Sequence, residues 1–221
     1  MSIHNEIKEM ILDLQNENIE ALENKYQNYF YKNKPLITKD MDGISGLWYI
    51  QDYLTTAEIE MFNKKLSNDE IELESISTKQ NSRRVAHYGY YYSYDKTGLK
   101  PAPAIPDYLE KLADVERINK ILRFDLIKKP FEQVIINEYK PCQEINYHTD
   151  HKVLFGSIIA CITVGQSVPI KFKFGDEIKT INIDAGSMYI MTGDARNIWQ
   201  HYLKNNGKNT RYSITYRTIN K

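Results

Sequence analysis

The chain has 221 residues, enough for one domain with an extension and for a substantial hydrophobic core. Its 29 lysines and arginines balance its 29 aspartates and glutamates, so no overall field attracts the protein to nucleic acid and any such binding must come from a local patch. Two cysteines, Cys142 and Cys161, exclude a disulfide framework and indicate a reducing compartment.

The N-terminal segment predicts a helix. Residues 3–31 place isoleucine, leucine and tyrosine near a seven-residue spacing, and Asn18 interrupts this apolar stripe. We interpret residues 1–31 as a helical extension that packs onto the domain that follows it; the alternative is a helix that binds a protein partner or dimerises. Pro35 lies just beyond the helix, and residues 32–46 are expected to form a polar linker.

The chain carries no sign of membrane insertion or export. Its first residues lack the basic and then apolar pattern of a signal peptide, and no stretch approaches the ~20 apolar residues of a membrane span. We therefore expect an intracellular, cytoplasmic protein without a membrane partner, with the nucleus as the alternative compartment. The sequence does not indicate the oligomeric state.

Between residues 47 and 122 the pattern predicts one strand and two helices. Residues 47–50 read as a strand, and Thr55 with Glu58 resembles a capping box that opens a helix through Leu66. Pro106 opens a second helix through about Leu122, with an apolar stripe along one side. Residues 96–104, rich in proline and glycine, are expected to form a loop.

The most unusual composition lies between Arg83 and Tyr94, where tyrosines follow two arginines and a histidine. Aromatic faces stack nucleobases and arginines hold phosphates, so one interpretation of the segment is nucleic-acid recognition. The alternative is that the tyrosines pack a core edge, because tyrosine favours strands. An unbroken strand would place Tyr88, Tyr90, Tyr92 and Tyr94 on one face. Composition alone does not choose between the two interpretations; the family resemblance described below favours recognition, with Arg83, Arg84, His87, Tyr88, Tyr90 and Tyr92 as the residues expected to bind substrate.

From residue 131 the pattern changes to short strands separated by turns. The expected strands are 132–139, 145–150, 156–164, 169–174, 178–183, 187–191, 198–202 and 210–218. This number and spacing predict an α+β chain with a double-stranded β-helix (jelly-roll) core and flanking helices. Cys161 lies in an apolar strand and is expected to be a packing residue, whereas Cys142, in a turn, is expected to be a free thiol without a role.

A metal site is predicted around His148. Asp150 lies two residues further on, so both side chains leave the same face of a strand. Two imidazoles and one carboxylate, with positions left open, form the facial triad of non-haem Fe(II) oxygenases. The second imidazole is that of His201, whereas His151 points to the opposite face and is a poor ligand.

The last predicted strand carries two arginines. Arg211, Ser213, Thr215 and Arg217 share one of its faces, and buried guanidinium groups need anionic partners. The arginine Cα atoms lie roughly 20 Å apart at about 3.3 Å per residue, so side chains that reach toward each other match a small dicarboxylate. Arginine binds carboxylates bidentately, which points to 2-oxoglutarate.

These motifs together resemble the AlkB family of Fe(II)/2-oxoglutarate dioxygenases. The resemblance rests on His-x-Asp, a later His and Arg-x-Ser-x-Thr-x-Arg in this order, with Ser213 where many relatives have Asn and Tyr202 where a small residue is common. Asn137-Glu-Tyr139 is similar to the family's Asn-x-Tyr element. The segments 83–89 and 191–196 look most like the branch that contains a tRNA wobble-uridine hydroxylase. The resemblance assigns residues 47–221 to the dioxygenase domain, with a nucleotide-recognition lid at about 83–104 and the jelly-roll core at about 131–218.

The resemblance implies Fe(II), 2-oxoglutarate and molecular oxygen as cofactors, with His148, Asp150 and His201 as metal ligands and catalytic residues. It implies that Arg217 pairs with the near carboxylate of 2-oxoglutarate and Arg211 with the distal one. The residues implied to bind 2-oxoglutarate are Asn137, Tyr139, Arg211, Ser213 and Arg217.

The expected reaction is oxidative demethylation of N-alkylated bases in DNA or RNA, a repair or RNA-modification activity that releases formaldehyde and succinate. One alternative is hydroxylation of a modified wobble uridine in tRNA. A protein side chain is a less favoured substrate. An alternative of another class is a non-catalytic nucleic-acid-binding module, against which the intact triad and arginine pair argue.

Overall fold

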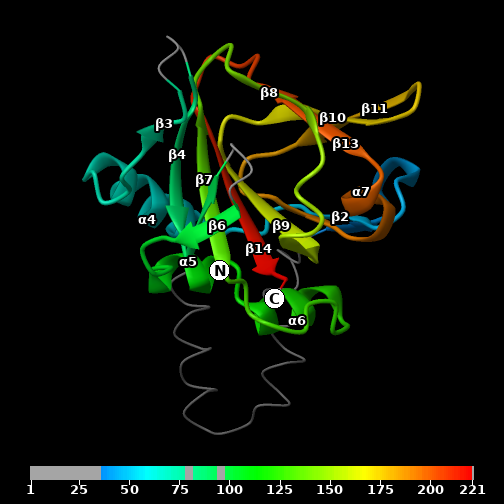
Figure 1. The fold of residues 1–221 in the computed structure, drawn as a ribbon, viewed down its shortest axis with the longest axis horizontal. Coiled ribbons are helices and arrows are strands. Elements are labelled where there is room, and N and C mark those ends of the chain that lie inside the picture. The colour runs from blue at the N-terminus through cyan, green and yellow to red at the C-terminus, as the bar shows by residue number, and fades with distance from the viewer. Residues whose placement is uncertain (1–35, 78–81, 94–97, 221) are drawn as a thin grey trace, which may run out of the picture. The chain divides into compact units, whose positions relative to one another are not determined.

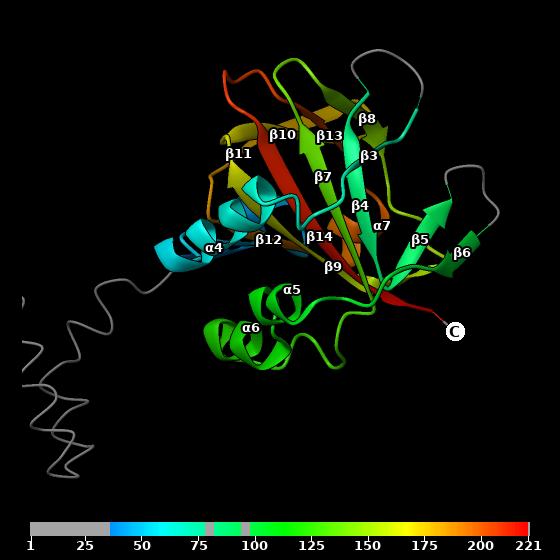
Figure 2. The ribbon, with the colours of Figure 1, turned by 90° about the vertical axis from the view of Figure 1, so that its left-hand side faces the viewer.

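The structure, a computed structural model, describes residues 36–77, 82–93 and 98–220 (Figure 1). The predicted helical extension, residues 1–31, lies outside the described residues. Two antiparallel sheets lie face to face, and helices cover the outer face of the larger one (Figure 2). No helix among the described residues is long and apolar enough to cross a membrane.

The larger sheet, here called the major sheet, has eight strands in the order β1-β2-β12-β9-β14-β7-β4-β3. Its central strands β9, β14 and β7 are almost wholly buried, because helices pack on one face and the second sheet on the other. The bounds in this order are Ile37–Lys39, Leu47–Ile50, Met188–Met191, Phe155–Gly165, Arg211–Ile219, Gln133–Tyr139, Arg84–Tyr88 and Glu74–Ser75.

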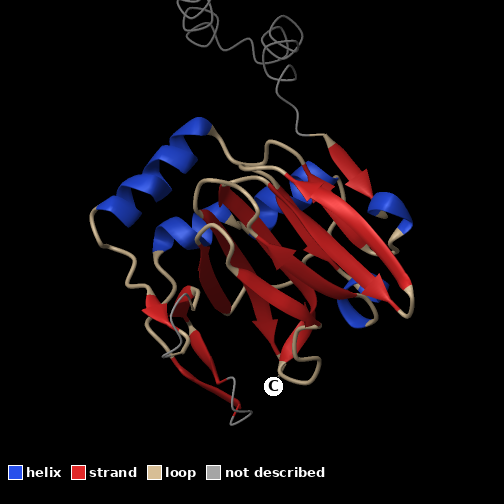
Figure 3. Ribbon diagram, turned by 90° about the horizontal axis from the view of Figure 1, so that it is seen from above, coloured by secondary structure: helices blue, strands red, loops and turns tan. Residues whose placement is uncertain are grey.

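The smaller sheet, here called the minor sheet, has four strands in the order β11-β10-β13-β8. Figure 3 shows the strands of the two sheets in red, one layer over the other. Apolar side chains of both sheets pack together in one buried cluster. A separate hairpin is formed by β5 and β6. The bounds are Glu177–Ile183, Val168–Phe174, Gln200–Lys204 and Glu144–His148 for the minor sheet, and Tyr90–Ser93 and Gly98–Pro101 for the hairpin.

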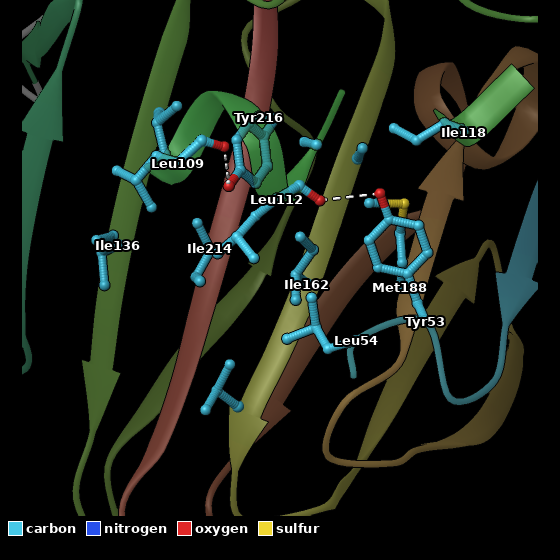
Figure 4. Close-up of a cluster of buried hydrophobic side chains, with 14 of the residues drawn as sticks. Tyr53, Leu54, Leu109, Leu112, Ile118, Ile136, Ile162, Met188, Ile214 and Tyr216 are labelled. Atoms are coloured by element: carbon cyan, nitrogen blue, oxygen red, sulfur yellow. Dashed lines mark hydrogen bonds between the residues drawn. The ribbon is translucent and has the colours of Figure 1, made fainter. Parts of the chain in front are cut away.

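Helices α4 (Thr56–Ser67), α5 (Asp107–Leu112) and α6 (Val115–Leu122) pack against the major sheet on the face away from the minor sheet. Two tyrosines fix the α5 end of this layer: the Tyr216 hydroxyl donates to the Leu109 carbonyl and the Tyr53 hydroxyl to the Leu112 carbonyl, each at 2.9 Å (Figure 4). The polar tips of these buried rings are therefore paired, and the sheet face beneath them stays apolar.

The predicted fold class and the helix that opens at the Thr55 capping box are confirmed. The strands expected after residue 131 all occur, with ends that differ by a few residues. The helix expected at 106–122 is interrupted, because Asp114 leaves the helical conformation and its side chain caps α6 by accepting from the Arg117 amide at 2.7 Å. Residues between the strands expected at 187–191 and 198–202 make the short helix α7 (Gly193–Asn197).

Two predicted boundaries differ from the structure. The sequence predicts a polar linker at 32–46, of which the structure describes residues 36–46. This part is not a plain linker, because β1 pairs with β2 and a 3-10 turn follows at Met41–Gly43. The expected lid, about 83–104, begins within the major sheet, because β4 pairs with β7. Gly89, at φ +74°, then separates β4 from β5, and a Cβ there would lie 2.0 Å from the Glu132 carbonyl oxygen. The expected alternation of tyrosines is therefore broken at Gly89.

Candidate metal centre

Two histidines meet across neighbouring strands of the minor sheet. His148 ends β8 and lies directly opposite His201 of β13, with ring centroids 4.2 Å apart. The Nδ1 atom of His148 lies 2.7 Å from the Asn146 carbonyl oxygen, a contact that leaves Nε2 free to bind a metal. Phe172, opposite His201 on β10, packs beside this ring.

Asp150 completes the group from just beyond β8. The expectation that it extends the strand is not met, because β8 ends at His148. Potential ligand atoms of His148, Asp150 and His201 nevertheless all lie within 4.8 Å of one another. This is the donor set that suits Fe(II), with the three groups on one side of the site.

The electrostatics of the group match its metal-binding form. Burial alone would raise the pKa of Asp150, but Arg217, His201, His148 and Arg196 together outweigh burial and hold that pKa well below its usual range. Burial, and then the neighbouring His148, lowers the pKa of His201 to about 3. A neutral imidazole beside an ionised carboxylate is the state that binds a divalent cation.

Two arginines hold the loop that carries Asp150. Arg217 donates to one carboxylate oxygen of Asp150, from Nε at 2.8 Å and from Nη2 at 2.5 Å, and its Nη1 donates to Gln133 at 3.1 Å. Arg196, from α7, is buried and donates to the backbone carbonyls of Asp150 at 3.0 Å and of His151 at 3.2 Å. The role expected for Arg217 toward the near carboxylate of 2-oxoglutarate stays a prediction, because in the structure its partner is the aspartate of the metal group.

Arg211 is the buried cation that calls for an anion. Its exposed fraction is 0%, and only Nη2 has a partner among the described residues, the Thr163 hydroxyl at 2.8 Å. The Nε and Nη1 atoms have no hydrogen-bond partner within the described ranges. A buried guanidinium with two unpaired edges is costly unless a carboxylate pairs with it, so Arg211 fits the distal carboxylate of 2-oxoglutarate.

A cavity of about 400 Å³ lies over the metal group. Its lining includes His148, Asp150 and His201, and also Tyr189, Ser213 and Tyr139, which is the cross-strand neighbour of Arg211. Asn137 also lines it, and its side-chain oxygen accepts from Arg83 Nε at 3.2 Å. The volume is in the range of small-molecule sites.

The structure divides the residues expected to bind substrate. Arg83 and Tyr92 line the cavity, and the Tyr92 ring packs against Phe155 with centroids 5.5 Å apart. Arg84 and Tyr88 point to the opposite, helix-covered face. There Arg84 donates to both oxygens of Glu138 at 2.7 Å, and Tyr88 is buried in the core. Pairing of β4 with β7 fixes which face each residue takes, so these two lie away from the cavity and their role in substrate binding stays a prediction.

His87 and Tyr90 take supporting positions. The His87 ring packs against Tyr91 at 5.4 Å, and burial followed by the charge of Arg217 lowers its pKa to about 4. Tyr90 contributes its backbone carbonyl, which accepts from Gln133 at 3.1 Å. Gln133 in turn holds Arg217, so Tyr90 acts on the site through the backbone.

Four polar residues of the site escaped the sequence analysis as functional positions: Gln133, Thr163, Tyr189 and Arg196. Gln133 and Arg217 are cross-strand partners of β7 and β14, and Thr163 pairs with Ser213 across β9 and β14. Only the pairing of distant strands shows these relationships. Cys161 is buried as expected, and its sulfur lies 2.9 Å from the Ser213 hydroxyl, whereas Cys142 is exposed.

Comparison with known proteins agrees with this geometry. Residues 46–217 match the model of the 2OG-Fe(II) oxygenase superfamily. An uncharacterized protein, L905, of Acanthamoeba polyphaga mimivirus is 31% identical over 202 residues, which are 85% of this chain and 91% of that protein.

A second relative has a described activity. The tRNA (carboxymethyluridine(34)-5-O)-methyltransferase alkbh8 of Xenopus tropicalis is 28% identical over 164 residues, covering 71% of this chain but only 24% of that protein. Among solved structures, OsALKBH1 superposes with a TM-score of 0.64 at 12% identity, covering 78% of this chain and 96% of that chain, which shows a shared fold.

Proposed function

This chain belongs to the 2OG-Fe(II) oxygenase superfamily and to its AlkB family, and we propose that it hydroxylates a carbon atom of a modified uridine in tRNA. As an oxygenase of this superfamily it is an oxidoreductase that uses Fe(II), 2-oxoglutarate and O₂. The observation that carries the proposal is that His148, Asp150 and His201 line a cavity together with Tyr139, the cross-strand neighbour of Arg211, whose buried guanidinium keeps two nitrogen atoms without a partner among the described residues.

The residues divide between cofactor and substrate. His148, Asp150 and His201 would hold Fe(II), and Arg211 would hold the distal carboxylate of 2-oxoglutarate. When bound, the iron supplies the oxygen chemistry by which 2-oxoglutarate becomes succinate and CO₂ while one oxygen atom enters a C–H bond of the substrate.

The protein's own groups position these parts. Arg217 keeps Asp150 ionised and fixes its orientation, and His148 is oriented by the Asn146 carbonyl. Arg83 and Tyr92 lie on the cavity wall, where a cation and an aromatic ring suit a nucleotide, the first for phosphate and the second for the base.

The named relative supports tRNA as the substrate. It is described as acting on carboxymethyluridine at position 34, and it matches this chain over 71% of the chain's length. That relative is a methyltransferase by name, whereas the group in this chain is an oxidising one, so we assign oxidation of a uridine substituent and not methyl transfer. The demethylation expected first from the sequence would use the same insertion at an N-methyl carbon, with loss of formaldehyde.

The test offers three substrates separately to the purified protein with Fe(II), ascorbate, 2-oxoglutarate and O₂. These are tRNA lacking its final wobble modifications, N-methylated single-stranded DNA and N-methylated RNA, with nucleosides followed by mass spectrometry. We expect a gain of one oxygen on a modified uridine, which His148→Ala abolishes. Loss of methyl groups as formaldehyde, with no oxygen gain on uridine, would replace the proposal by demethylation. No change in any nucleoside would refute action on these nucleic acids.

A further inference from the structure

The two faces of the minor sheet have different chemistry. Its inner face directs His148 and His201 toward the cavity, with apolar neighbours around them. Its outer face carries the alternate residues of the same strands. Lys171 lies opposite Tyr202 in the register of β10 and β13, and Lys173 lies opposite Gln200. The metal group and this outer face are therefore separated by the thickness of one sheet.

An aromatic pair lies on the outer face. The rings of Tyr147 and Tyr202 stack with centroids 5.1 Å apart and planes 28° from parallel. The Lys171 ammonium lies 6.0 Å from the Tyr202 ring centroid, and the Lys173 ammonium lies 5.8 Å from that of Tyr147. Two cations and two partly exposed rings thus occupy one small patch.

The positive charge continues along the edge of the sheet. Lys204, two residues beyond Tyr202, lies opposite Glu144 of β8, and the Glu144 carboxylate accepts from the Tyr202 hydroxyl at 2.7 Å. Lys204 also lines a groove of about 420 Å³ together with Arg83 and Lys140. The formal net charge of the whole chain is zero. Lys171, Lys173, Lys204 and Lys140 outnumber Glu144 here, so this region carries a local excess of positive charge.

The patch is continuous with the active site. Tyr147 lines the cavity over the metal group, and Arg83 lines both that cavity and the groove. A polymer that places one nucleotide in the cavity would therefore reach the patch by passing over β8, the edge strand of the minor sheet that carries Tyr147. Partly exposed tyrosine rings can stack with unpaired bases, and lysines donate to the phosphates between them, which is the chemistry of single-stranded nucleic acid binding.

We propose that the outer face of the minor sheet, from Lys173 across Tyr147 and Tyr202 to the groove at Lys140, binds the single-stranded loop of an RNA whose target nucleotide occupies the cavity. The proposal rests on the proposed function in that the substrate is RNA. A duplex keeps its bases stacked inside the helix and offers none of them to the tyrosine pair, so the face suits a loop better than a stem.

The test measures binding of a fluorescently labelled tRNA anticodon stem-loop by anisotropy at several salt concentrations. The first variant is Lys171→Glu with Lys173→Glu, and the second is Tyr202→Leu. The matched control is Lys111→Glu with Lys120→Glu, which makes the same charge change at exposed positions of α5 and α6. All variants should keep the rise in melting temperature caused by 2-oxoglutarate with Fe(II) in the absence of oxygen, which reports an intact cavity.

We expect the double lysine variant to bind the stem-loop at least roughly tenfold more weakly and to lower the salt slope of log K by about 1.4, since each phosphate contact in a single strand contributes about 0.7. Tyr202→Leu should weaken binding to the loop but not to a duplex of the same length, and the control should bind like the wild type. Equal binding by the double lysine variant and the control, or no binding by the wild type, would overturn the proposal. Mass spectrometry of the same RNA reads the oxidation separately, so a wild type that binds but does not oxidise the RNA would refute the proposed function and not this surface.

Discussion

Replacing Arg211 by methionine is expected to leave the ligand-free protein more stable while removing its response to 2-oxoglutarate. The guanidinium is fully buried, and its Nε and Nη1 atoms have no partner among the described residues. Each unpaired buried donor costs about 1–3 kcal/mol, so replacing the guanidinium by methionine removes a penalty of about 4 kcal/mol for the two nitrogen atoms. Loss of the Nη2 bond to Thr163 offsets about 2 kcal/mol of that gain. The expected net change is about 2 kcal/mol toward the folded state, or roughly 4–8 °C in melting temperature.

The assay is thermal unfolding with Fe(II) in the absence of oxygen, with and without 2-oxoglutarate. At about 100 times its Kd, the co-substrate stabilises the wild type by about 2.7 kcal/mol, and Arg211→Met should lose this increment. The matched control is Arg84→Met, because Arg84 is paired with both oxygens of the buried carboxylate of Glu138. That change should lower the melting temperature and keep the 2-oxoglutarate shift. A ligand-free Arg211→Met protein that melts well below the wild type, or one that keeps the full shift, would refute the reasoning.

Three further predictions follow from the groups around the metal site. Arg217→Met leaves the Asp150 carboxylate buried without its cation and should lower the ligand-free stability by about 3–5 kcal/mol. Fe(II) should restore part of this loss. Equal melting temperatures of the variant and the wild type without metal would contradict the prediction. Arg196→Met removes the hydrogen bonds to the backbone carbonyls that position Asp150. It should weaken Fe(II) binding by about 10–100-fold in an anaerobic titration. Unchanged affinity would show that the loop keeps its conformation without Arg196. His87 has its pKa lowered to about 4 by burial, so the unfolded chain takes up the proton first and stability is lost as pH falls from about 6.5 toward 4. Urea unfolding of His87→Phe at pH 7 and 5 should therefore show a smaller loss than the wild type, by roughly 1 kcal/mol after allowance for partial exposure, and parallel losses would exclude this histidine as the cause.

The sequence predicted the ingredients of the site because they depend on short-range patterns. A period of two places Arg211 and Arg217 on one face of β14, and the structure buries both on the side of the cavity. His-x-Asp and the later histidine supply the residue types of an Fe(II) site, and the structure brings His148, Asp150 and His201 together. The jelly-roll class followed from the number and spacing of short strands, which the chain itself specifies through its alternation and turns.

Only the tertiary structure decided which of these residues touch one another. Pairing of β4 with β7 turned Arg84 and Tyr88 to the helix-covered face, although the local composition of their segment indicated substrate recognition. Arg217 bonds to Asp150, and Arg211 bonds to Thr163. Both contacts depend on which strands are neighbours and on the register in which they pair. A shift of one residue in register reverses every side chain of a strand, and no period within one strand reports its register with another. The sequence by itself therefore determined the chemistry that the protein carries, and the pairing of distant strands determined where each group acts.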